Sequence, residues 1–158
     1  PKIAALLAQG KIIGWMSGRM EFGPRALGGR SILGDARDPE MQKRMNLKIK
    51  FRESFRPFAP AVLEERLADI FELDRPSPYM LLVADVKRSR CLPQRGDERD
   101  LPLVEWVNRP RSDLPAITHV DFSARVQSVS RATSPRFAVM VSPNAEPFSA
   151  STLTMPSP

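Results

Sequence analysis

Apolar residues near the start of the chain recur at the spacing of a helix. Ile3 is followed three and four positions later by Leu6 and Leu7, and Gly10 stands where helices commonly end. The next apolar run, residues 12–16, has the length and composition of a buried strand. A helix followed directly by a strand predicts a domain of the α/β or α+β class.

A second helix is predicted to begin near residue 38. Residues 38–40, Asp-Pro-Glu, combine an N-cap aspartate, a proline at the first helical position and an acid in the first turn. After this helix, apolar and basic residues alternate over 49–52, with the sequence Ile-Lys-Phe-Arg. A period of two predicts an extended segment with Lys50 and Arg52 on one face. Two cations on one face suit a polyphosphate ligand, but an amphipathic edge strand protected by a lysine has the same pattern.

The middle of the chain continues to alternate between strand-like and helical patterns. Strand character is predicted for 55–63, 79–86 and 114–129, and a short amphipathic helix for 64–71. These elements extend the mixed α/β prediction to residue 133.

Two segments lack such patterns. Residues 87–113 begin with a polar, charged stretch punctuated by Gly and Pro, so they are expected to form an exposed loop. Residues 134–158 are rich in Ser and Pro and almost uncharged. We expect them to be a poorly ordered tail outside a domain that spans 1–133.

The charge of the chain is concentrated in one stretch. Residues 18–60 hold ten Lys/Arg and five Asp/Glu, a surplus close to the formal net charge of +6 for the whole chain. The basic residues are spaced among glycines rather than run together, which favours an anion pocket over a basic tail. The charge alone leaves open nucleic acid, an anionic membrane surface or a phosphorylated small molecule.

The basic stretch contains a candidate anion-binding loop at 21–31. Gly-Pro and Gly-Gly turn signals bracket Arg25, and Arg30 and Ser31 follow directly. Backbone N–H groups and two guanidinium groups can bind an oxyanion such as phosphate. Glu21 is expected to pair with one of the arginines. A solvated basic loop is the alternative, but three interleaved apolar residues are expected to anchor this one: Phe22, Leu27 and Ile32.

Other classes of protein are disfavoured by composition. One cysteine, Cys91, and one histidine, His119, form neither an internal disulfide nor a credible metal site, so no metal ligands are assigned. We expect Cys91 to be incidental and His119 to be structural rather than catalytic. No run of about 20 apolar residues and no signal-type leader occurs, so we expect a cytoplasmic protein. Because the chain begins with Pro1, we expect it to be a piece of a larger protein.

Three sequence motifs in one order carry a resemblance to a known family. GRMEFGPRALGGRSIL, IKFRESFRPFAP and HVDFSARVQSV resemble the C-terminal domain of the NodU/CmcH-type carbamoyltransferases. The resemblance covers about residues 3–137, apart from the segment around 87–113. It implies a YrdC-like α/β domain with a twisted mixed sheet and flanking helices. It also implies a larger N-terminal, metal-binding domain of the actin-like superfold as a partner in the same chain.

The resemblance implies a reaction as well. The YrdC-like domain of this family joins a carbamoyl group, derived from carbamoyl phosphate, to ATP with Mg²⁺, forming carbamoyl-adenylate and pyrophosphate. The partner domain then transfers the carbamoyl group to a hydroxyl of an acceptor. The motifs assign the catalytic roles to Lys50, Arg52 and Arg125. They assign nucleotide and substrate binding to these three residues together with Arg25, Arg30 and Ser31.

Two alternatives to a complete adenylating domain stay open. The family continues beyond the equivalent of Phe137 with an L-N-T-S-F-N-x-x-G-E-P motif that supplies the polar half of its nucleotide site. No match follows here, since Ser142-Pro143-Asn144 lacks those surroundings. The domain is therefore expected to be incomplete at its C-terminus, and a non-catalytic remnant is one alternative. A basic RNA-binding module is the other, disfavoured because the arginines lie among glycine turns rather than on an aromatic stacking platform.

Overall fold

The structure is a computed structural model that describes residues 2–93, 101–142 and 150–153. Its α-helices are α1 (Lys2–Ala8), α2 (Met41–Lys48), α3 (Leu67–Ile70), α4 (Leu103–Asn108) and α5 (Pro135–Val141). Its strands are β1 (Ile13–Met16), β2 (Arg30–Asp35), β3 (Ala61–Leu63), β4 (Val83–Asp85), β5 (Ser123–Arg125), β6 (Gln127–Val129) and β7 (Ala150–Leu153). Two 3₁₀ helices, η1 (Glu64–Arg66) and η2 (Arg88–Arg90), complete the described elements.

The N-terminal elements follow the apolar pattern. Helix α1 is followed by Gly10, whose φ of 72° is the left-handed conformation of a helix end, and strand β1 comes next. The predicted helix at 64–71 is also confirmed, as η1 and α3, with Leu67, Ile70 and Phe71 buried. The mixed α/β class is therefore confirmed.

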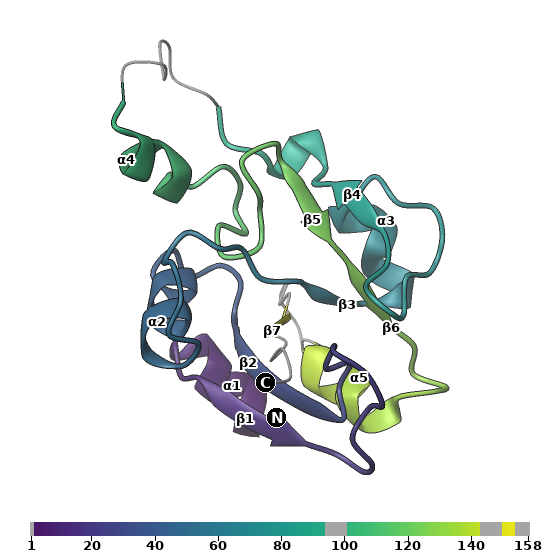
Figure 1. Ribbon diagram of the computed structural model, residues 1–158. Helices are drawn as coiled ribbons and strands as arrows, with labels where there is room; N and C mark the ends of the chain where they lie inside the picture. The colour runs from purple at the N-terminus through teal and green to yellow at the C-terminus, as the bar shows by residue number, and fades with distance from the viewer. Residues whose placement is uncertain (1, 94–100, 143–149, 154–158) are drawn as a thin grey trace.

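The described strands form three small sheets rather than the single twisted sheet that was expected. β1, β2 and β7 make an antiparallel sheet in that order, β3 and β6 pair in parallel, and β4 and β5 pair antiparallel (Figure 1). The strands are short because Gly and Pro interrupt the apolar runs between them.

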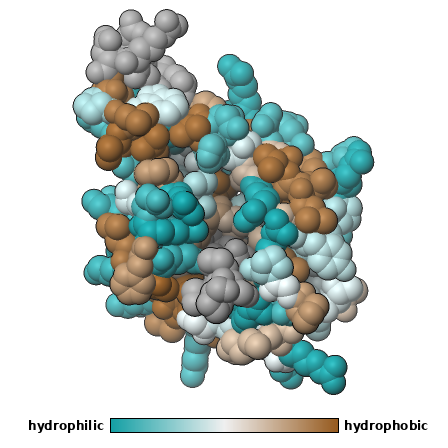
Figure 2. Space-filling model, viewed as in Figure 1, coloured by the Kyte–Doolittle hydropathy of each residue, from teal (hydrophilic) through white to brown (hydrophobic). Residues whose placement is uncertain are grey.

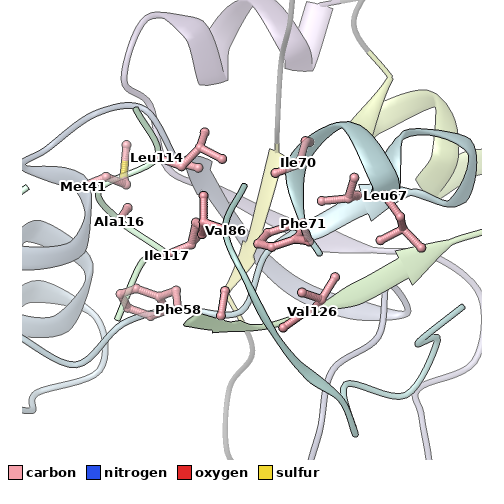
Figure 3. Close-up of a cluster of buried hydrophobic side chains, with 14 of the residues drawn as sticks. Met41, Phe58, Leu67, Ile70, Phe71, Val86, Leu114, Ala116, Ile117 and Val126 are labelled. Atoms are coloured by element: carbon pink, nitrogen blue, oxygen red, sulfur yellow. The ribbon is translucent and has the colours of Figure 1, made fainter. Parts of the chain in front are cut away.

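Two hydrophobic clusters lie on either side of β3. Val62 belongs to the larger cluster, whereas Ala61 and Leu63 belong to the smaller one, as the alternation of a strand requires. In the larger cluster, α2 contributes Met41 and the segment before β5 contributes Leu114, Ala116 and Ile117 (Figure 3). The smaller cluster joins α1, β2, β3, β6 and α5. Strand β3 is thus shared by both clusters.

The segment 49–52 is not extended, which corrects the prediction from its alternating pattern. Helix α2 ends in a turn, in which the N–H groups of Ile49 and Lys50 both donate to Met45 O. Phe51 has a φ of 47° and is 85% exposed, so it does not pack as the apolar half of a strand. The helix also begins later than expected, at Met41, after Asp38 accepts the N–H of Glu40.

Two predicted strands are shorter than their apolar runs. Only 83–85 of 79–86 is a strand, and the segment is not fully buried: Tyr79, Leu81 and Val83 are exposed, whereas Met80, Ala84 and Val86 are buried. In the same way, 55–63 becomes a strand only at 61–63. Pro57 and Pro60 break the earlier part, since proline cannot donate to a ladder.

The prediction of an exposed loop at 87–113 is confirmed in part: among its described residues only Arg111 and Ser112 are buried, but the segment is not all loop. This segment contains η2 and α4, and Cys91 forms an antiparallel bridge with Ser112. Arg111 is only 5% exposed because its guanidinium donates to the carbonyl oxygens of Trp106 and Arg109 and stacks on the Trp106 ring. Residues 94–100 lie outside the described residues.

The prediction of a poorly ordered tail is wrong for residues 135–141. Helix α5 starts with Pro135 at its first turn and buries Phe137, Ala138, Met140 and Val141 in the smaller cluster. Strand β7 adds a further described element at 150–153. The rest of the predicted tail, 143–149 and 154–158, lies outside the described residues.

Candidate functional site

The glycine-rich loop before β2 is organised by Glu21. One carboxylate oxygen of Glu21, Oε1, accepts the backbone N–H groups of Leu27 (2.7 Å) and Gly29 (2.6 Å). Although burial acts to raise the pKa of Glu21, these hydrogen bonds and the charge of Arg30 hold it below its usual value. The expected pairing of Glu21 with an arginine is therefore confirmed, with Arg30 as the partner at 3.7 Å.

Arg30 ties this loop together with its guanidinium. It donates to Glu21 O (2.6 Å) and to Gly23 O (2.7 Å), so most of its interactions lie within the loop. Ser31 is 4% exposed, and its hydroxyl has no partner within the described residues. The structure therefore gives Arg30 a part in the loop framework, and the role of Arg30 and Ser31 in binding an anion stays a prediction.

The anchors of the loop differ in part from those expected. Phe22 is fully exposed, whereas Ile32 is partly buried against the larger cluster and Ala26 is completely buried. The Trp15 indole donates to Gly28 O at 2.8 Å, and a Cβ at Gly28 would lie 2.6 Å from the Phe137 ring. The loop is therefore also held by the close approach of its backbone to these two rings.

Arg52 is held by the buried side-chain amide of Asn46, which lies in helix α2. Asn46 is completely buried, and its Nδ2 donates to Ser54 O (3.0 Å) and Arg56 O (2.8 Å) while its Oδ1 accepts Arg52 Nε (2.6 Å). The backbone N–H of Arg52 donates to Asn46 O at 3.1 Å. One side chain thus fixes both the turn after α2 and the guanidinium of Arg52.

Arg52 also connects the turn to the core. Its guanidinium carbon lies 4.9 Å from the centroid of the Phe58 ring, a cation–π contact with a buried aromatic. Phe58 lies just before β3. The carbonyl oxygen of Pro60 accepts the N–H of Gln127, and β3 and β6 pair in parallel beyond this hydrogen bond. The cations after α2 are therefore connected through β3 to the strand that follows Arg125.

Arg25 and Arg125 form the second pair of cations. Partial burial and the nearby charge of Arg25 lower the pKa of Arg125, which ends β5. Gln127 brings the two together, because its Nε2 donates to Leu27 O at 2.8 Å and so joins β6 to the loop that carries Arg25. Within the described residues neither Arg25 nor Arg125 forms an ion pair with a carboxylate. Excess positive charge is a property of an anion site.

Lys50 and Arg52 have lowered pKa values for the same reasons as Arg125, burial and a neighbouring cation. Burial and then the charge of Arg52 lower the pKa of Lys50 to about 8. Burial and the charge of Arg56 lower the pKa of Arg52, against the opposing effect of Glu53. Cations with depressed pKa values mark candidate functional sites, since a bound anion would relieve the repulsion. The structure therefore offers two cation pairs, Arg25 with Arg125 and Lys50 with Arg52.

The low pKa of Lys50 predicts a pH-dependent affinity for anions. Below pH 8 the amine is charged, and between pH 7 and pH 9 most of that charge is lost, so anion affinity should fall by about 3- to 10-fold. Sulfate is a suitable probe because its own charge is constant over this range. Sulfate titrations followed by NMR, with Lys50→Arg as a variant that stays charged, should show the fall in the natural chain only. An equal pH dependence in both proteins would contradict the role of Lys50.

One face of the molecule is hollowed near its centre. Figure 2 shows the hollow between the side that carries α2 and the side that carries β4 and β5, with hydrophilic residues beside it. The other described cavities lie elsewhere. The largest of them, about 720 Å³, is lined by residues that include Asp85, Cys91 and Asp121.

The remaining candidates do not form a catalytic group. His119 contacts Asp121 at 3.3 Å on the surface, and the Cys91 thiol donates to carbonyl oxygens while burial raises its pKa. In the part of the chain that the structure describes, no three His, Cys, Asp or Glu side chains gather as metal ligands. Among these residues, no helix is long and apolar enough to cross a membrane.

Two functional residues were missed by reasoning from the sequence. Asn46 and Gln127 position the cation pairs, although neither was assigned a role in the site. Each stands as a polar amide among buried neighbours, Asn46 beside Met45 in α2 and Gln127 beside Val126 and Ser128. A buried amide must satisfy its hydrogen bonds, so an uncharged polar residue inside an apolar pattern was the available signal.

Comparison with known proteins identifies relatives of this chain. Residues 4–153 match the family described as "Carbamoyltransferase C-terminus". The chain is 62% identical over 136 residues to the "Uncharacterized protein sll1178" of Synechocystis sp., covering 86% of this chain and 22% of that protein. It is 44% identical over 135 residues to "Nodulation protein NolO" of Bradyrhizobium diazoefficiens, covering 83% and 21%. It is 45% identical over 130 residues to "Nodulation protein U" of Sinorhizobium fredii, covering 82% and 20%.

These matches bear on the extent of the domain. The chain spans about a fifth of the length of these relatives. The family match continues past residue 133 through α5 and β7, in agreement with the packing of α5. Residues 135–141 are therefore part of the same domain as the cation pairs. By the match over 4–153, the chain belongs to the family of carbamoyltransferase C-terminal domains.

Proposed function

We propose that this domain forms carbamoyl-adenylate from ATP and a carbamate derived from carbamoyl phosphate, for the O-carbamoylation of a hydroxyl acceptor. The observation that supports it is the presence, in a member of this family, of two cation pairs in which Lys50, Arg52 and Arg125 have lowered pKa values. Both ATP and carbamoyl phosphate are anions. Their binding would neutralise the repulsion between Lys50 and Arg52 and between Arg25 and Arg125.

The proposed step needs stabilisation of charge rather than a general base. A carbamate oxygen attacks the α-phosphorus of ATP, and the bond from that phosphorus to the bridging oxygen of the β-phosphate breaks. Carbamoyl-adenylate forms and pyrophosphate leaves with the bond electrons. Negative charge accumulates on the α-phosphate and on the leaving group, where fixed guanidinium and ammonium donors lower the barrier. Lys50, Arg52 and Arg125 take this catalytic role, with Arg25 as a binding residue.

The proposal treats Mg²⁺ as part of the nucleotide substrate. Mg²⁺ retains water and phosphate oxygens as ligands and often uses few protein groups. The domain's own residues would bind the phosphates and orient the α-phosphorus.

The proposal is tested by isotope exchange between pyrophosphate and ATP. The 158-residue chain is incubated with ATP, Mg²⁺ and labelled pyrophosphate, with either carbamoyl phosphate or ammonium carbamate. Exchange that depends on the carbamoyl compound is the expected result, because only a reversible adenylation returns the label to ATP. Carbamate tests the adenylation alone, since it does not require prior loss of phosphate from carbamoyl phosphate.

The same assay separates the alternatives. A chain that binds ATP but exchanges no label with either compound would be a non-catalytic remnant. Binding of random-sequence RNA with a steep salt dependence, and without competition by ATP, would instead support the RNA-binding module. Acceptor transfer would belong to the additional chain length found in the relatives, where the expected actin-like domain would lie.

A further inference from the structure

Phe51 is an exposed aromatic side chain in a conformation that non-glycine residues rarely adopt. Its φ of 47° lies in the left-handed region, and its side chain is 85% exposed. Two other described non-glycine residues have a positive φ, Met80 and Phe122. Met80 is completely buried, so packing of its side chain offsets the backbone cost. Phe51 has no such compensation within the described residues.

The neighbours of Phe51 hold it in this conformation. The N–H of Lys50 donates to Met45 O at 3.0 Å, and the N–H of Arg52 donates to Asn46 O at 3.1 Å. Asn46 Oδ1 accepts Arg52 Nε, and Asn46 Nδ2 donates to the backbone on the far side of the turn. The backbone on both sides of Phe51 is therefore fixed before any ligand binds. A persistent strained residue in such a framework is a reason to look for a function.

The setting of the ring points to the chemistry of its ligand. Phe51 stands between Lys50 and Arg52, whose pKa values are lowered by burial and by neighbouring positive charge. Consecutive Cα atoms are about 3.8 Å apart, so the three side chains start within about 8 Å of one another, a span that one nucleotide covers. An aromatic surface beside cations matches a molecule that carries both a flat ring and phosphates. A purely anionic ligand would make no use of the ring.

We propose that the Phe51 ring is the stacking surface for the base of the nucleotide whose phosphates bind Lys50 and Arg52. This inference rests on the proposed function and adds a residue that selects a nucleotide over other polyphosphates. Stacking of a base on an aromatic side chain contributes about 1–3 kcal/mol, which corresponds to about 5- to 100-fold in affinity.

The test compares ATP with inorganic triphosphate, which lacks the base. Both are titrated with Mg²⁺ by calorimetry into the 158-residue chain and into Phe51→Gly, a variant that loses the ring and tolerates the left-handed conformation. We expect the affinity for ATP to fall about 5- to 100-fold and the affinity for triphosphate to stay unchanged. Phe51→Trp should bind ATP at least as tightly as the natural chain. Its additional tryptophan fluorescence should change with ATP and not with triphosphate.

A matched control removes a different exposed ring. Tyr79 is 63% exposed, and its neighbours are Pro78 and Met80 rather than cations, so Tyr79→Ala should leave ATP affinity unchanged. Saturation-transfer NMR gives an independent readout, because adenine protons near the ring should lose signal in Phe51→Gly alone.

The possible outcomes distinguish a failure of this inference from a failure of the proposed function on which it rests. If the natural chain binds neither ATP nor triphosphate, the nucleotide function itself fails. If it binds ATP and Phe51→Gly binds it equally well, only the stacking role is overturned, and the ring would then face another protein segment. Equal losses for ATP and triphosphate would also overturn it, because they would show damage to the phosphate site.

Discussion

Replacing Arg125 by alanine is expected to lower the carbamate-dependent exchange of pyrophosphate into ATP by a factor on the order of 10² to 10³. Arg125 ends β5, and its partial burial beside Arg25 lowers its pKa without an ion pair from the described residues. A guanidinium in this position is available to an anion, and loss of one fixed donor to developing charge has an effect of this size. The exchange rate at saturating ATP measures it.

The control for Arg125→Ala removes the same charge elsewhere. Arg131 is exposed and donates to Glu65 at 2.7 Å, outside the cation pairs, so Arg131→Ala should retain exchange. Arg125→Lys should show an intermediate rate, since lysine keeps the charge but loses the planar donor geometry. Unchanged exchange in Arg125→Ala would remove this residue from the site.

Replacing Gly28 by alanine is expected to destabilise the domain by about 2–5 kcal/mol, from backbone strain and overpacking together. Gly28 has a φ of 112°, which side-chain-bearing residues rarely adopt, and the new Cβ would lie 2.6 Å from Cδ1 of Phe137. Phe137 is buried in the smaller cluster and cannot move aside without disturbing its neighbours. For a chain of this size, the melting temperature should fall by about 5–15 °C.

Gly23 provides the matched control for this prediction. Its φ of 141° imposes a similar backbone cost, but a Cβ there would meet no atom within 4 Å. Gly23→Ala should therefore lose only the part of the stability that comes from backbone strain. If the two variants melt together, helix α5 does not pack against the glycine-rich loop as described here.

Local patterns predicted the helices that show both an apolar spacing and an end signal in the sequence itself. The helices at the start of the chain and at 64–71 needed only their apolar spacing and a terminating residue, and both are present. The pattern at 49–52 failed because a turn after a helix and a short strand accept the same four residues. The hydrogen bonds of Asn46 to residues further along the chain decide between them.

The C-terminal prediction failed for a different reason. The segment that forms α5 contains few charges and begins at a Ser-Pro pair, so its composition is that of a tail. Its helix is stabilised by burying Phe137 and Met140 against distant elements, α1 and β3 among them. Tertiary burial of this kind leaves little trace in local composition.

In the candidate site, too, local sequence patterns predicted one part and tertiary contacts decide the other. The sequence identified the basic residues, because cations spaced among glycines can be recognised without knowledge of the fold. It did not separate Arg30, which holds the loop together, from Arg25, which lies near Arg125. That distinction depends on the carbonyl oxygens that the loop turns toward Arg30, and these are set by the folded backbone.

The position of β3 between the two clusters has a consequence for the newly made chain. Strand β3 is synthesised before its parallel partner β6 and before α5, the helix that covers its other side, both of which come from the last third of the described chain. Until that last third has left the ribosome, β3 lacks its partner strand β6 and the part of the smaller cluster that α5 supplies. The emerging polypeptide therefore exposes an unpaired apolar strand, which is the kind of segment that chaperones protect from aggregation.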